Sequence, residues 1–368
     1  GTSTLGSVTI DGSNDAAAIT SDALTSLKVV NTGSSSDVTV TNATTAGHTL
    51  ALTLGNNASG TSVTDDTATS VTVTTEAQAL STAANASKAN VNLNAAKATS
   101  LVFNNAQAVT LSGTGTLDGT TKVTAIDLNG AGKVTLGDVT DATKLTSIDA
   151  TDSTGGVAVT IGSTGSYGMS VKGGAGADTV TLKASSTLAS ALVNGVTVST
   201  SIDLGAGNDK LLNAGTAASG SATVGAGTVI DGGDGVDTVS ATLVSVGNAG
   251  LFKNFETVDL KGAASGGSLD AALMTNSSIS GVALSGATGG GTFTVSNLTG
   301  TDVKVTVSDN TGSSVGAVYA TLASSAGTSD TATLTFAATS SGTTESVLGK
   351  LKTTGIESLN IASGGTLA

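Results

Sequence analysis

The residues best suited to chemistry in this chain lie in three glycine-aspartate turns. The turns occupy residues 173–178 (GGAGAD), 204–209 (LGAGND) and 232–237 (GGDGVD), and each is followed by a short strand-forming segment with an apolar residue. They match the calcium-binding pattern G-G-x-G-x-D-x-U-x, in which U is a large apolar residue. Glycine lets the backbone adopt positive φ and turn its carbonyl oxygens inward, and aspartate supplies the hard anionic oxygen that Ca²⁺ prefers.

The spacing of the turns indicates how they are arranged. Asp178, Asp209 and Asp237 are 31 and 28 residues apart (209 − 178 and 237 − 209). This interval is too long for the half-turns of a compact β-roll and suits one turn in each coil of a wider solenoid, with the loops stacked along one edge. The alternative is three metal-free turns, because Gly and Asp favour turns in any case. Three copies at coil spacing favour calcium.

The predicted Ca²⁺ ligands are the turn glycines, through their carbonyl oxygens, and the acids within or just before the turns. These residues are Gly174, Gly176, Asp178, Asp203, Gly205, Gly207, Asp209, Asp231, Gly233, Asp234, Gly235 and Asp237. The second turn is the poorest match, because Leu204 stands in place of its first glycine.

The elements that must position these turns are short strands. Period-two apolar segments recur at a steady interval of roughly 20 to 30 residues, which is in the range of repeat architectures. Their central residues are Leu27, Leu50, Val71, Leu101, Ile126, Ile148, Met169, Ile202, Ile230, Val258, Val282, Val303 and Leu359. This regularity predicts an all-β fold, an elongated right-handed parallel β-solenoid or β-helix. In places two strands of one coil are visible, as in residues 123–128 followed by 133–136.

We expect three segments along the solenoid: 1–172, a calcium-binding segment 173–262, and 263–368. Helix is scarce, and two stretches are candidates for either a short helix or an irregular loop. Residues 76–97 are rich in alanine, and residues 344–352 place apolar side chains at helical spacing.

Composition excludes several classes of function. The net charge of −13 argues against binding to nucleic acid or anionic membranes, and no run approaches the roughly 18 apolar residues of a membrane span. Cysteine is absent, so disulfides cannot stabilise the fold. The N-terminus lacks the features of a signal peptide, and we expect the chain to be a fragment of a longer exported protein whose anchor to cell-surface polysaccharide lies elsewhere.

Catalytic constellations are missing from the sequence. There is no HExxH motif and no phosphate-binding loop, and the single histidine, His48, is interpreted as a surface residue. Asp65 and Asp66 are interpreted as a solvated turn, because adjacent strand residues face opposite ways. A polysaccharide-active β-helix enzyme is a remote alternative, since the chain offers no Trp and no Arg for a sugar cleft. The prediction is a non-enzyme.

Residues 141–262 resemble the RTX (repeats-in-toxin) type of bacterial surface-layer protein. The similarity rests on residues 144–150, 171–180 and 232–239, the last leading to the F-E-T-V-D-L strand at 255–260. A looser copy runs from 329–335 to the I-E-S-L-N-I strand at 356–361. No G-G-x-G-x-D precedes Asp330, so no metal is assigned there.

The resemblance implies a β-solenoid with RTX calcium-binding turns in a type I-secreted structural protein. Such a subunit would self-associate into the two-dimensional lattice of an S-layer at the cell surface, and Asp178, Asp209 and Asp237 would be its calcium ligands. The turn motif is shared with RTX adhesins, toxins and proteases. An adhesin that forms no lattice is therefore the main alternative, and it would stay monomeric with calcium where a lattice subunit would form sheets.

Overall fold

In the computed structural model, nearly all of the regular secondary structure is β-strand. The structure describes residues 3–42, 44–78, 88–111, 122–162, 168–189, 191–193, 196–215, 220–286, 291–308, 316–324, 326–337 and 348–363. The helices in these ranges are three 3₁₀ turns, η2 (Ala241–Leu243), η3 (Ala249–Leu251) and η4 (Ala271–Leu273). Among the described residues, no helix is long and apolar enough to cross a membrane. The chain divides into two compact units, Gly1–Thr181 with Ala191–Gly207, and Leu182–Ser190 with Asn208–Ala368.

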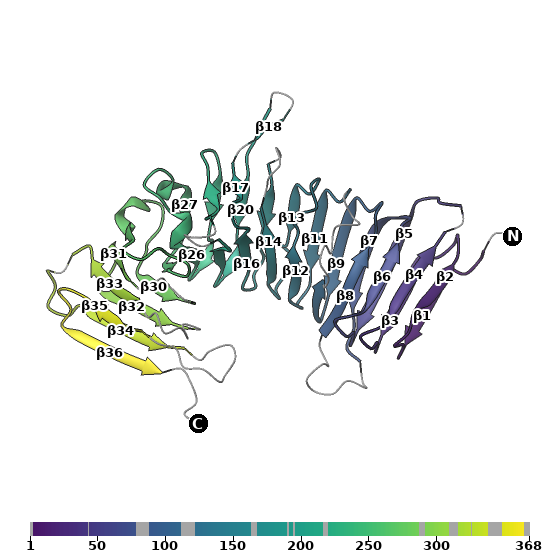
Figure 1. Cartoon of the computed structure of the whole chain (residues 1–368), viewed down its shortest axis with the longest axis horizontal. Helices are drawn as coiled ribbons and strands as arrows, with labels where there is room; N and C mark the ends of the chain where they lie inside the picture. The colour runs from purple at the N-terminus through teal and green to yellow at the C-terminus, as the bar shows by residue number, and fades with distance from the viewer. Residues whose placement is uncertain are drawn as a thin grey trace. The chain divides into compact units, whose positions relative to one another are not determined.

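Strands of the first unit alternate between two parallel sheets, so that each coil contributes one strand to each sheet (Figure 1). One sheet has the order β1 (Ser7–Asp11), β3 (Ser26–Val30), β5 (His48–Gly55), β7 (Ala68–Thr75), β9 (Ser100–Asn105), β11 (Ala125–Asn129), β13 (Ser147–Asp149), β15 (Ser170–Lys172) and β20 (Ser201–Asp203). The other has the order β2 (Ala17–Thr20), β4 (Asp37–Thr41), β6 (Ser62–Asp65), β8 (Lys88–Asn94), β10 (Ala108–Leu111), β12 (Val134–Asp138), β14 (Val157–Ile161) and β16 (Thr179–Leu182). The hairpin of β18 (Ala191–Val193) and β19 (Val196–Val198) is antiparallel.

In the interior of the coils, the strand register places apolar side chains of successive coils directly on one another. The predicted centres Leu50, Val71, Leu101, Ile126 and Ile148 pair in one continuous column, and all are almost completely buried. The shortest coil along this sheet runs from Ser7 to its register partner Ser26, and the longest runs from Ser170 to Ser201. The predicted parallel solenoid is therefore confirmed, and its coils are close to the predicted length.

The second unit is built from the same kind of coil. Its longest sheet has the order β22 (Lys210–Asn213), β26 (Thr238–Ser240), β28 (Thr257–Asp259), β30 (Gly281–Leu284), β32 (Asp302–Val307), β34 (Thr331–Phe336) and β36 (Ser358–Ser363). A second sheet joins β29 (Ser268–Asp270), β31 (Thr292–Leu298), β33 (Ala317–Leu322) and β35 (Lys350–Lys352). Smaller pairs are β24 (Val229–Asp231) with β27 (Phe252–Lys253), and β17 (Thr187–Leu188) with β23 (Thr223–Val224).

Several details of the predicted periodicity are wrong. Leu27 is in register with Leu52 rather than Leu50, and Val282 is in register with Val305 rather than Val303. Val171 rather than Met169 continues the buried column after Ile148. In the second unit, Ile230 lies in β24, whereas Val258 lies in β28 of the longest sheet. The physical reason is that both strands of a coil carry the same apolar alternation, so a spacing count can move from one sheet to the other unnoticed.

Neither candidate helix is helical where the structure describes it. Residues 88–94 form β8 and residues 350–352 form β35, while 79–87 and 338–347 lie outside the described residues. In β8, Val91 and Leu93 alternate with polar residues, are buried, and pair in register with strands of adjacent coils. Period-two burial thus outweighs the helix propensity of the neighbouring alanines.

Because apolar side chains stack in the interior of the coils, truncating an interior side chain should lower the free energy of unfolding far more than truncating an exposed one. Leu52 is fully buried between Leu27 and Val73 of the adjacent coils. We expect Leu52→Ala to lower the free energy of unfolding by about 2–5 kcal/mol, measured by urea denaturation. The control Leu5→Ala, at a side chain 47% exposed, should change it by less than about 0.5 kcal/mol. Equal effects of the two variants would contradict the described core.

Candidate calcium site at the glycine-aspartate turns

The first and second turns stack directly on each other within the first unit. The Gly173 N–H donates to the Asp203 carbonyl at 2.7 Å, and the Ala206 N–H donates to the Gly174 carbonyl at 2.7 Å. Gly205 has φ +87°, and a Cβ there would lie 2.3 Å from the Gly174 oxygen. The close approach of successive turns, together with positive φ, is why this position requires glycine.

Asp178 uses its carboxylate to close its own turn. Oδ1 accepts the Val157 N–H of the preceding coil at 2.6 Å, and Oδ2 accepts the Gly174 N–H at 2.9 Å. The residue is 2% exposed, and burial raises the pKa of its carboxyl group, although the two N–H groups and the charge of Lys133 act in the opposite direction. Because both oxygens accept backbone hydrogen bonds, a cation would have to compete with them here.

The end of the second turn stacks on the third turn within the second unit. The Asp209 N–H donates to Asp237 Oδ1 at 2.8 Å, and the Thr238 N–H donates to the Asp209 carbonyl at 2.8 Å. The Val236 N–H donates to Asn208 Oδ1 at 3.0 Å. Asp209 and Asp237 are both fully buried, so two of the predicted ligands are brought together.

Asp237 has an incompletely satisfied carboxylate in the third turn. Its Oδ2 is buried and has no hydrogen-bond partner among the described residues. Burial, and then repulsion from Glu256, Asp231 and Asp234, raises the pKa of Asp237 from 3.8 to about 6 against the stabilising Asp209 N–H. A buried anionic oxygen among further acids is unfavourable unless a cation or a proton neutralises it. The third turn therefore fits a hard divalent cation.

The other acids of the third turn differ in their environment. Asp231 Oδ2 lies 2.6 Å from Lys253 Nζ, and its Oδ1 accepts from the Gly233 N–H at 3.1 Å and from Asn254 Nδ2 at 2.7 Å. Asp234, in the two-residue strand β25 (Asp234–Gly235), is exposed. Asp231 is thus partly neutralised by lysine, and Asp234 remains accessible to a cation from solvent.

Three of the remaining predicted glycine ligands have the positive φ expected of the motif, whereas Gly174 and Gly176 do not. Gly207, Gly233 and Gly235 have φ of +147°, +95° and +149°. Asp203 is exposed, and its Oδ1 accepts the Gly205 N–H at 3.2 Å. Leu204, which replaces glycine in the motif, is fully buried in the core.

Side chains alone do not assemble a metal centre. Within the described part of the chain, no three His, Cys, Asp or Glu side chains are grouped so that they could hold a metal ion. A cation at these turns would therefore need backbone carbonyl oxygens or water in addition to carboxylate. Flexible oxygen coordination of that kind is typical of Ca²⁺.

Glu256 has a structural role at the third turn that the sequence did not reveal. Its Oε2 accepts the Asp237 N–H at 2.8 Å, and the Glu256 and Thr257 N–H groups both donate to the Asp237 carbonyl at 3.1 and 2.9 Å. The glutamate of one coil thereby fixes the aspartate of the coil before it. The available signal was the F-E-T strand itself, which marked a resemblance without showing a contact.

His48 and Asp65 are not the surface residues that the sequence suggested. The His48 side chain is 13% exposed, and its Nε2 lies 3.0 Å from Oδ2 of the fully buried Asp65. Asp65 Oδ1 accepts the N–H groups of Thr67 and Ala68, both at 3.0 Å. The turn after β6 is thus held together by its aspartate, and only Asp66 is exposed.

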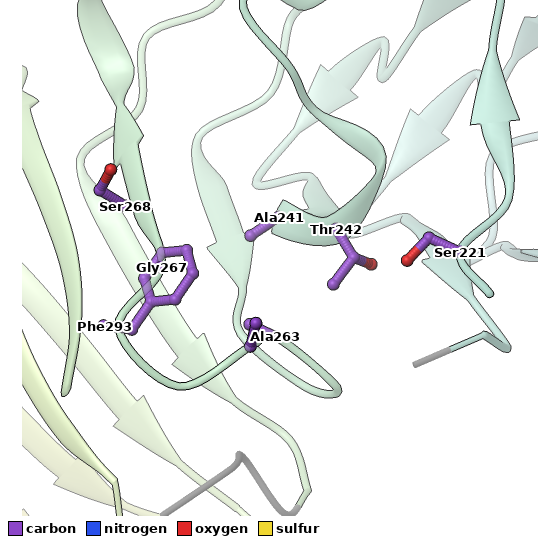
Figure 2. Close-up of a pocket in the computed structure, with 8 residues that line it drawn as sticks. Ser221, Ala241, Thr242, Ala263, Gly267, Ser268 and Phe293 are labelled. Atoms are coloured by element: carbon purple, nitrogen blue, oxygen red, sulfur yellow. The ribbon is translucent and has the colours of Figure 1, made fainter. Parts of the chain in front are cut away.

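A pocket of about 230 Å³ lies in the second unit (Figure 2). Ala241, Ala263, Gly267 and Phe293 supply its apolar lining, and its polar groups include the hydroxyls of Ser221 and Thr242. The lining contains no titratable side chain, so it offers no side chain for acid–base chemistry.

The raised pKa of Asp237 predicts a specific dependence of stability on pH. The native state holds this proton more tightly than the unfolded state, so the stabilisation is fully present below pH 3.8 and is lost as pH rises through about 6. In EDTA, we expect the melting temperature of wild type to fall relative to that of Asp237→Asn as pH rises from 3.8 through about 6. Parallel pH profiles for the two proteins would contradict this assignment.

Comparison with known proteins leaves the function to be argued from these turns. A scan of protein-family models found no match to the chain, and a search of curated proteins found no significant match.

Proposed function

We propose that the chain is a structural subunit of a calcium-dependent bacterial surface layer, exported by a type I pathway. The observation that carries the proposal is the buried Asp237 Oδ2, which has no hydrogen-bond partner among the described residues and lies among acids in a glycine-rich turn. The parallel coils and the stacking of successive turns support it. The resemblance of residues 141–262 to RTX surface-layer proteins supplies the class of assembly.

Calcium would act at the interfaces between coils. Asp237 and Asp231, with Asp234 at the surface, would supply carboxylate oxygens, and the glycine turns would supply carbonyl oxygens. Extracellular modules bind Ca²⁺ with Kd on the order of 0.1–1 mM, so such sites would be largely empty inside a cell and filled outside it. At a concentration ten times Kd, each site stabilises the fold by about 1.4 kcal/mol.

The same ion would assist assembly. The chain carries a net charge of −13 and only 14 basic residues, so neighbouring subunits repel one another at low ionic strength. Calcium lowers that repulsion by neutralising carboxylates, and it holds the turns in one geometry so that contact surfaces repeat from subunit to subunit.

Calcium should raise the melting temperature of wild type, and Asp237→Asn should reduce that rise. Asp178→Asn should also lower the melting temperature in EDTA, because both Asp178 oxygens accept backbone N–H groups. Asp127→Asn is the matched control, since Asp127 is exposed on β11. Asp149 is a poorer control because it pairs with Lys172 at 3.5 Å. If Asp127→Asn reduced the calcium-induced rise in melting temperature as much as Asp237→Asn does, the effect would come from total charge rather than from a specific site.

The intact protein should form two-dimensional sheets in millimolar Ca²⁺, visible by electron microscopy, and chelation should disperse them into soluble subunits. Magnesium should substitute poorly, because it prefers octahedral sites that retain water. A protein that stays monomeric across the calcium range while binding glycans or host cells would contradict the lattice and support the RTX adhesin instead.

A further inference from the structure

The turn at Asp330 has the same hydrogen-bond pattern as the turn at Asp237. The Asp330 N–H donates to Glu357 Oε2 at 2.8 Å, the same distance as from the Asp237 N–H to Glu256 Oε2. The Asp330 carbonyl accepts the N–H groups of Glu357 and Ser358 at 2.9 and 3.2 Å. Both aspartates are therefore fixed by a glutamate from the next coil of the same unit.

The Asp330 carboxylate is also buried and incompletely satisfied. The residue is 2% exposed, and its Oδ2 has no hydrogen-bond partner among the described residues. It folds back over a glycine: a Cβ on Gly327 would lie 2.8 Å from Oδ1 and 2.9 Å from Oδ2. The third turn has the equivalent arrangement, in which a Cβ on Gly232 would lie 3.0 Å from Asp237 Oδ2.

The glycine-aspartate motif does not reveal these similarities between the turns at Asp330 and Asp237. No G-G-x-G-x-D run precedes Asp330, and the residues directly before it are Gly327, Thr328 and Ser329. A single glycine nevertheless leaves room for the carboxylate, and Glu357 supplies the second acid from the adjacent coil. Two different loops thus present a buried carboxylate oxygen on an aspartate whose backbone N–H is bound by a glutamate of the next coil.

We propose that Asp330 and Glu357 bind a divalent cation, calcium under the conditions of the proposed function, at a site that the glycine-aspartate motif does not mark. Asp330 Oδ2 supplies the buried anionic oxygen, Glu357 supplies a second carboxylate, and carbonyl oxygens of residues 327–329 with water complete the coordination. The cation neutralises a charge that would otherwise be buried without a partner. The choice of ion rests on the proposed function; the site itself rests on the Asp330 geometry.

The test is calcium titration calorimetry on the 368-residue chain, with circular dichroism to verify folding. We expect Asp330→Asn to bind one Ca²⁺ fewer than wild type. Gly327→Ala keeps every charge and places a methyl group against both carboxylate oxygens, so it should lose the same ion. Glu357→Gln, at an exposed side chain, should weaken this site by about 10- to 100-fold.

Two matched controls should keep the wild-type stoichiometry. Asp302→Asn alters a half-buried aspartate on the preceding coil, whose Oδ1 accepts from Thr331 and Thr333. Gly247→Ala adds a methyl group where nothing lies within 4 Å.

The outcomes separate this inference from the proposed function. Unchanged stoichiometry and affinity in folded Asp330→Asn and Gly327→Ala would overturn the Asp330 site, and loss of calcium from Asp237→Asn alone would leave the proposed function standing. Loss from Asp330→Asn but not from Asp237→Asn would support this site and count against the motif turns. A wild-type chain that binds no calcium would overturn both.

Discussion

The constraint on which this structure depends is the close approach of the turns that join the strands of successive coils. Parallel strands of successive coils lie about 4.8 Å apart, so the turns that join them are also pressed together and their backbone N–H groups are removed from water. Each buried N–H needs an acceptor. At Asp65, Asp178 and Asp237 that acceptor is a carboxylate, which receives N–H groups from its own turn or from the adjacent coil. These aspartates therefore have a structural role that does not depend on a metal ion.

The structural role and the proposed metal-binding role of these aspartates would compete for the same oxygens. Asp178 accepts backbone hydrogen bonds with both oxygens, so cation binding there would displace or share them. Asp237 accepts the Asp209 N–H with Oδ1, while its Oδ2 is buried without a hydrogen-bond partner among the described residues. Copies of one motif are therefore not equivalent sites, and the difference arises from which neighbouring N–H reaches each carboxylate rather than from the motif itself.

The periodicity of apolar residues was sufficient to predict the stacked strands of the coils. It was not sufficient to predict the contacts made at the turns between strands. The column from Leu50 to Ile148 was predictable because apolar alternation marks interior positions directly. The sheet to which Val258 belongs was not predictable, since both strands of a coil alternate alike. The pairing of His48 with Asp65 also escaped prediction, because the facing partner of a side chain at a turn depends on how the chain bends there. The site at Asp330 escaped prediction for a related reason: it shares with Asp237 a hydrogen-bond pattern that involves the following coil, and a motif written along one loop cannot contain a contact made by the next one.

The arrangement shared by the turns at Asp237 and Asp330 is an aspartate in one turn and a glutamate from the next coil. Such an arrangement explains why several weak cation sites would suit this fold. In a stack of coils, each coil contacts mainly its neighbours, and stability is approximately a sum of coil terms and interface terms. A cation bound at Asp237 strengthens one interface and a cation bound at Asp330 strengthens another, several coils further along the second unit. A single tight site would leave the remaining interfaces unchanged, and the weakest of them would still open first. Distributed sites of modest affinity would therefore stabilise a solenoid more evenly than one strong site, and each interface that holds a site would respond to the calcium concentration.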